Sequence, residues 1–91
     1  MIVARKLTIG GDVQGVGFRF FAQRSAAKHQ VRGYVRNLRD GRVEAWVEGT
    51  TKAVEAFKQD MHAGPTYSRV GEIEELVVEP SGLYSNFRIE R

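Results

Sequence analysis

The order in which strand-like and helix-like periodicities alternate is the feature that most constrains the fold of this chain. Apolar residues recur at every second position in some segments and at helical spacing in others. This pattern predicts strands over residues 3–9, 31–38, 43–47, 70–79 and 84–89. It also predicts a helix from about Phe18 and a second helix that Thr50 or Thr51 caps and that Gly64-Pro65 ends. Turns are expected at Gly10-Gly11, Asp40-Gly41 and Pro80-Ser81-Gly82.

The resulting order is β-α-β-β-α-β with a possible short last strand. It is the order of the ferredoxin-like α+β sandwich, in which two helices cover one face of an antiparallel sheet of four to five strands. A right-handed crossover through the first helix makes the first two strands parallel, with the third between them. The C-terminal ends of these strands and the N-terminus of the first helix should therefore meet at one edge of the sheet.

The size of the chain is that of one domain. Its 91 residues, 42% of them hydrophobic, predict a single domain over residues 1–91. No stretch is long enough to cross a bilayer, and the first residues lack the features of a secretion signal. We therefore expect a cytoplasmic protein with no membrane partner. The large apolar residues expected in its core include Leu7, Ile9, Val47, Phe57 and Phe87.

Several kinds of catalytic site are excluded by composition. The sequence contains no cysteine, which removes thiolate nucleophiles, disulfides and Cys-ligated metals. His29 and His62 lie far apart without a carboxylate set, so we expect neither a metal nor a cofactor. Asp12, Asp40 and Asp60 form no Asp-x-Asp pair for a phosphoaspartate mechanism.

A glycine-rich loop between the first strand and the first helix is the first candidate for a binding site. In Gly11-Asp12-Val13-Gln14-Gly15-Val16-Gly17-Phe18-Arg19 the glycines let the backbone curl before a helix whose first N–H groups lack partners. Such a loop suits a phosphoryl dianion, and Arg19 adds a bidentate donor. The glycines by themselves favour a plain strand-to-helix turn over a binding site.

Asn37 is the second candidate. It lies at the predicted C-terminal end of the second strand, which the topology brings beside the glycine loop. Its amide is able to hold a water molecule there. The alternative is an ordinary hairpin residue ahead of Asp40-Gly41.

Two stretches of the sequence together resemble the acylphosphatase family. They are Val13-Gln14-Gly15-Val16-Gly17-Phe18-Arg19 and Gly33-Tyr34-Val35-Arg36-Asn37. The resemblance implies a hydrolase that cleaves acyl phosphates, with Arg19 and Asn37 as its catalytic residues. Arg19 would bind the phosphoryl oxygens, and Asn37 would orient the attacking water. The phosphate-binding loop would be completed by the N–H groups of Gln14, Gly15, Val16, Gly17 and Phe18.

The resemblance also sets expectations about ligands. The substrate would be a small acyl phosphate, and inorganic phosphate would be both product and inhibitor. A carboxylate departs without protonation, so charge stabilisation and positioning are sufficient for catalysis. No deep acyl pocket is evident in the motifs, and broad tolerance toward the acyl group is expected. Asp12 departs from the basic or neutral residue common in the family and is expected to weaken substrate attraction somewhat.

Two alternatives come from other functional classes. One is a noncatalytic, phosphate-binding or regulatory module of acylphosphatase type, as found inside larger proteins. The other is RNA binding, because Arg32-Gly33-Tyr34-Val35 is similar to the start of an RNA-recognition motif. Arg36 stands where that motif requires an aromatic residue, so we expect no nucleic-acid partner and pair Tyr34 with Trp46 across the sheet instead. A monomer is expected.

Overall fold

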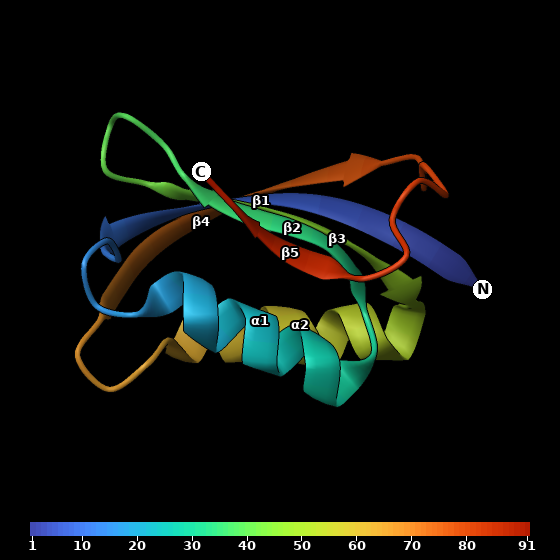
Figure 1. Ribbon diagram of the computed structural model, residues 1–91, viewed down its shortest axis with the longest axis horizontal. Helices are drawn as coiled ribbons and strands as arrows, with labels where there is room; N and C mark the ends of the chain where they lie inside the picture. Colours follow the sequence, from blue (N-terminus) through green and yellow to red (C-terminus); the bar gives the residue numbers. More distant parts are fainter.

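The computed structural model describes residues 1–91 and contains five strands and two helices. The strands are β1 (Ile2–Asp12), β2 (Arg32–Asn37), β3 (Val43–Thr50), β4 (Arg69–Val78) and β5 (Phe87–Glu90). The helices are α1 (Phe18–His29) and α2 (Thr51–Ala63), and both lie on the same face of the sheet (Figure 1). Neither helix has the length and apolar character that crossing a membrane requires.

The sheet has the strand order β4-β1-β3-β2-β5. β1 and β2 both pair antiparallel with β3, so they run parallel to each other on either side of it. The ferredoxin-like fold and its central crossover are therefore confirmed. One pair differs from an all-antiparallel sheet, because β5 lies parallel to β2 and makes the sheet mixed.

The connection between β4 and β5 explains that difference. Pro80-Ser81-Gly82 does not close a hairpin, since β4 and β5 lie at opposite edges of the sheet. The carboxylate of Glu48 on β3 accepts hydrogen bonds from the Ser81 N–H, the Ser81 hydroxyl and the Gly82 N–H. The connection is thus anchored as it crosses the end of the sheet, and Phe87 then packs its ring 5.5 Å from that of Phe57.

The first strand is longer than its sequence suggests. Gly10 and Gly11 do not end it, and β1 continues to Asp12 with a register irregularity between Ile9 and Gly11. Gly11 has φ 111°, and a Cβ at this position would clash with the carbonyl oxygen of Arg69. The glycine is therefore needed for close pairing with β4 at a bulge.

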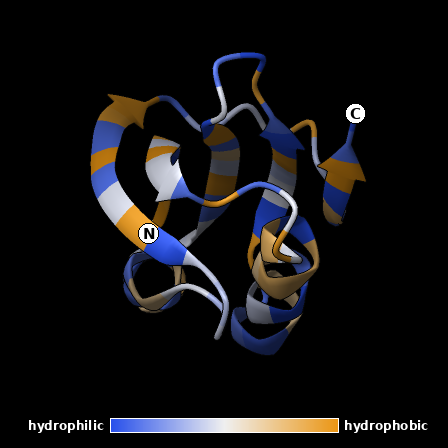
Figure 2. Ribbon diagram, turned by 90° about the vertical axis from the view of Figure 1, so that its left-hand side faces the viewer, coloured by the Kyte–Doolittle hydropathy of each residue, from blue (hydrophilic) through white to orange (hydrophobic).

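The core lies between the sheet and the two helices. Leu7, Ile9, Val47, Phe57 and Phe87 are all buried there, as predicted. Figure 2 shows hydrophobic and hydrophilic bands alternating along the strands, which is the pattern of a sheet with one face on a core. The core holds the ends of β1 and β2 in a fixed relation to α1.

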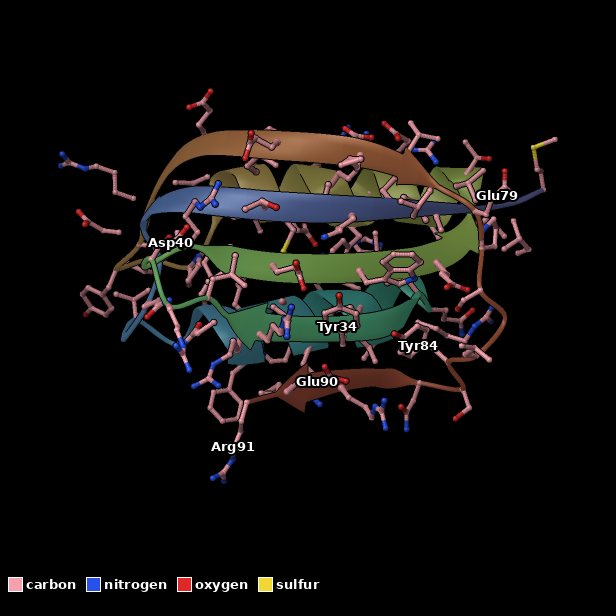
Figure 3. All side chains as sticks on the ribbon, turned by 90° about the horizontal axis from the view of Figure 1, so that it is seen from above. Tyr34, Asp40, Glu79, Tyr84, Glu90 and Arg91 are labelled. Carbon is pink, nitrogen blue, oxygen red and sulfur yellow. The ribbon has the colours of Figure 1, made fainter.

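The opposite face of the sheet carries polar and aromatic side chains. Tyr34 lies opposite Trp46 in the register, as predicted, and its ring centroid is 5.9 Å from that of Tyr84 (Figure 3). The Tyr34 hydroxyl and the Arg36 guanidinium both donate to Glu44. This face is tied together by its own hydrogen bonds.

Replacement of Glu48 by glutamine should destabilise the fold. The carboxylate is 1% exposed and also accepts from the Trp46 indole at 2.6 Å. Burial alone would raise the pKa of Glu48, but the hydrogen bonds from Ser81, Trp46 and Gly82 outweigh burial and lower it. Hydrogen bonds to a charged group are worth about 1.5–3 kcal/mol, so we expect a loss of about that size at pH 7 in urea unfolding.

The sign of the pH dependence follows from the lowered pKa. A carboxyl whose pKa is lower in the folded state adds stability above its unfolded pKa of about 4.3, and this contribution is lost as pH falls through the folded pKa. The parent and Glu48→Gln should therefore converge in acid. Glu79→Gln, an exposed change at the start of the same connection, is the control (Figure 3). Equal stability of the parent and Glu48→Gln at pH 7 would contradict the anchoring role.

Candidate active site

The loop over residues 13–17 joins β1 to α1 and leaves several N–H groups free. Gly15 and Gly17 have φ 73° and 77°, in the left-handed region that glycine adopts without strain. Gly17 is the N-cap of α1, with no side-chain hydrogen bond to the first turn and no acidic residue in that turn. The N-terminus of α1 therefore presents unsatisfied donors and the positive end of the helix dipole.

A pocket of about 120 Å³ opens at this helix end. Arg19 from the first turn of α1 and Asn37 from the end of β2 both line it. The crossover topology brings the two residues together, as the element order predicts. The remaining lining residues are Val13, Gly15, Gly17, Phe18 and Phe20.

Gln14 and Val16 are expected to contribute main-chain N–H groups to the phosphate cradle, and their side chains have partners outside the pocket. Val16 is half-buried and packs against the hydrophobic core. Gln14 turns its side chain to the β2–β3 connection, where its amide Nε2 donates to the carbonyl oxygens of Leu38 at 2.7 Å and Arg42 at 2.9 Å. Neither lines the pocket, whereas Gly15, Gly17 and Phe18 do.

The Gln14 side chain has a positioning role that sequence reasoning missed. Its two hydrogen bonds join the glycine loop to the segment that follows Asn37. The loop and the end of β2 are thus held at a fixed spacing across the pocket. The sequence signal for this role was the polar Gln14 between the apolar residues Val13 and Val16. Its hydrogen-bond partners could not be read from the sequence, because only the folded chain brings them within reach.

The side chains of Arg19 and Asn37 have no hydrogen-bond or ion-pair partner within the chain. The charged side chains near Asn37 are engaged, because Arg36 donates to Glu44 at 2.8 Å and Arg42 donates to Asp40 at 2.8 Å. The Asn37 amide makes no hydrogen bond with the chain, and the Arg19 guanidinium forms no ion pair. Both groups are consequently available to a ligand in the pocket.

No acidic side chain lines the pocket. Asp40 follows Asn37 in the turn, and hydrogen bonds from the Arg42 guanidinium and N–H hold the pKa of its carboxyl below the usual range. It is therefore ionised at neutral pH and is no proton donor. Asp12 is exposed, lies opposite Arg69 in the register, and is not among the lining residues.

The arrangement suits a small anion and offers no ready ligand set for a metal. No group of three or more His, Cys, Asp or Glu side chains is placed to hold a metal ion. The pocket combines free N–H groups, one guanidinium and one amide. Such a site is able to bind a phosphoryl group and a water molecule next to it.

Comparison with known proteins agrees with this geometry. The sequence profile described as Acylphosphatase matches residues 5–89. The acylphosphatase of Thermococcus kodakarensis is 49% identical over 81 residues, covering 89% of each chain. That of Nitrobacter winogradskyi is 44% identical over 81 residues, covering 89% of this chain and 82% of its own.

Solved structures give the same result. The crystal structure of acylphosphatase from Bacillus subtilis superimposes with a TM-score of 0.94 at 34% identity and covers 100% of both chains. Full-length HypF, crystallised in a phosphate- and nucleotide-bound form, matches with a TM-score of 0.88 at 35% identity. This chain corresponds to only 12% of the HypF chain.

Proposed function

Because this chain belongs to the acylphosphatase family and is an acylphosphatase, we propose that the pocket between the glycine loop and the end of β2 is its active site. Arg19 and Asn37 are its catalytic residues. The single observation that carries this assignment is that both side chains, free of partners within the chain, line one pocket beside the free N–H groups of α1.

The phosphoryl group of the substrate binds at the N-terminus of α1. Its oxygens accept hydrogen bonds from N–H groups of the loop and the first helical turn, where the helix dipole favours negative charge. The Arg19 guanidinium adds two parallel N–H donors and compensates the charge that develops during transfer. Gly15 and Gly17 leave open space where their Cβ atoms would stand, so the backbone is accessible to the anion.

Asn37 positions the water that attacks phosphorus. Its carbonyl oxygen accepts a hydrogen bond from the water, which directs a lone pair of the water oxygen toward the phosphorus atom. The new P–O bond forms as the bond to the acyl oxygen breaks, and the carboxylate leaves with the electron pair. A phosphoryl oxygen of the substrate takes the proton of the water, because the pocket contains no protein base.

The lack of a proton donor among the residues that line the pocket also sets the substrate class. A carboxylate leaving group needs no proton from the protein, whereas the alkoxide of a phosphate monoester does. With no acid in the pocket, mixed carboxylic-phosphoric anhydrides are hydrolysed in preference to monoesters. Inorganic phosphate, which carries the same phosphoryl oxygens, binds as product and inhibits competitively.

Turnover of benzoyl phosphate is the first test. We expect hydrolysis that is unchanged by EDTA, competitive inhibition by inorganic phosphate, and far slower hydrolysis of p-nitrophenyl phosphate. Loss of activity in EDTA that magnesium restores would contradict the metal-free mechanism. Phosphate binding without turnover of benzoyl phosphate would instead indicate the noncatalytic module, as a domain-level likeness to HypF would allow.

Three further assignments belong to this proposal. Residues 1–91 form a single domain with its own core. The protein acts as a monomer in the cytoplasm. Light scattering of the purified chain and fractionation of cells test the last two, and a stable dimer or a membrane-bound fraction would overturn them.

A further inference from the structure

A second and larger pocket adjoins the phosphate site. It has a volume of about 500 Å³ and is lined by Arg19, Phe20, Ile89 and Arg91. Arg19 and Phe20 also line the 120 Å³ pocket, so these two residues form the boundary between the pockets. A molecule held by its phosphoryl group in the small pocket has the large one immediately beside it.

The parallel pairing of β5 brings the end of the chain to this place. Val35 lies opposite Ile89 and Arg36 opposite Glu90, so β5 ends beside the end of β2 that carries Asn37. Side chains alternate along a strand, which puts Ile89 on the face of the buried Val35, and Arg91 follows directly after the end of β5. Figure 3 shows Arg91 and Asp40 toward one end of the sheet and Glu79 at the other.

The lining of the larger pocket combines apolar surface with positive charge. Phe20 lies in the first turn of α1 and is 67% exposed. Ile89 is partly buried and packs against the core. Arg91 is exposed and forms no ion pair, while neighbouring Glu90 is paired with Arg88 at 3.4 Å. No carboxylate side chain lines the pocket. The lining therefore fits a short carbon chain that ends in an anion.

We propose that this larger pocket is an acyl-group subsite that selects acyl phosphates whose acyl chain carries a second anionic group. Phe20 and Ile89 contact the carbon chain, and Arg91 faces the distal anion. The proposal rests on the proposed function, since the phosphoryl group in the small pocket places the acyl carbons next to Phe20. It replaces the broad acyl tolerance expected from the motifs with a preference for anionic acyl groups.

Succinyl phosphate and butyryl phosphate test this preference. Both have four-carbon acyl groups, but only succinyl phosphate ends in a carboxylate. Arg91→Gln should lower the ratio of kcat/KM for succinyl over butyryl phosphate about 1.4- to 5-fold at low salt, which is the range for an exposed charge pair. The ratio of the parent should fall toward that of the variant as salt rises, because the charges are screened.

Lys52→Gln is the matched control. Lys52 is another exposed cation without an ion pair, and it lies in the first turn of α2, at the far end of β3 from the Asn37–Val43 pair. Both variants lower the net charge by one, but only Arg91→Gln should change the ratio. An unchanged ratio in Arg91→Gln, or an equal change in Lys52→Gln, would overturn the subsite.

A third substrate identifies the anion. In 3-phosphoglyceroyl phosphate the distal group is a phosphate, so a larger effect of Arg91→Gln on this substrate than on succinyl phosphate identifies phosphate as the preferred anion, and the reverse identifies carboxylate. Phe20→Ala should lower kcat/KM for benzoyl phosphate more than for acetyl phosphate, and equal losses would count against the apolar wall. Absence of turnover of every acyl phosphate by the parent would contradict the proposed function itself.

Discussion

Arg19→Ala is expected to lower kcat by a factor on the order of 10² to 10³ and to weaken the binding of inorganic phosphate. The guanidinium lines the pocket without a protein partner, so its donors are available to the phosphoryl group in the ground state. They act more strongly as charge redistributes during transfer, which is why both affinity and rate should fall. Benzoyl phosphate kinetics and calorimetry with phosphate measure the two effects.

Arg24→Ala is the control for this variant. Arg24 lies on the same helix, is exposed and does not line the pocket. It matches Arg19 in residue type and charge change, so any loss that it causes measures the general effect of removing a cation from α1. Circular dichroism should show both variants folded. A folded Arg19→Ala protein with the kinetics of Arg24→Ala would refute the phosphoryl-binding role.

Asn37→Ala is expected to lower kcat by a factor of about 10² or more and to leave the dissociation constant of inorganic phosphate nearly unchanged. The reason is that the amide is assigned to the nucleophile, and misplacing a reacting group costs about this much in rate. The anion cradle is built by α1 and its loop, which the substitution does not touch. The effect should therefore appear in kcat with little change in phosphate affinity.

Asn86→Ala is the natural comparison, because Asn86 is exposed and outside the pocket. Its main-chain carbonyl accepts from the Gly33 N–H, a bond that alanine retains. Activity close to that of the parent is expected for it. If Asn37→Ala loses phosphate binding as severely as Arg19→Ala, or keeps full turnover, the division of roles between the two residues is wrong.

Much of this structure was predictable because it depends on local pattern. Helix α1 begins at Phe18 as predicted, and Thr50 caps α2 by accepting from the Ala53 N–H at 3.2 Å. The Asp40-Gly41 turn joins β2 to β3. Given this order of elements, the handedness of the crossover is sufficient to bring Arg19 and Asn37 to one edge. Their roles in the reaction stay predictions.

Other features depended on contacts between segments distant in sequence. The Gln14 side chain points toward the carbonyl oxygens of Leu38 and Arg42 because it donates hydrogen bonds to them, and only the folded chain brings these oxygens within reach. The two glycines at the end of β1 predict a bend, and the close approach of β4 at Arg69 makes them part of a bulged strand instead. A glycine permits both conformations, so its neighbour decides between them.

The sequence by itself determined the order of elements, the apolar faces and the two motifs, because periodicity and turn residues act over a few neighbouring positions. Only the tertiary structure decided where β5 lies. Alternation with period two is the same in parallel and antiparallel strands, so it carries no information on the partner or direction of a four-residue strand. The partner and the direction of β5 are set by tertiary contacts, namely the hydrogen bonds of residues 81–82 to Glu48 and the burial of Phe87. The same contacts bring Arg91 to the pocket that Arg19 also lines.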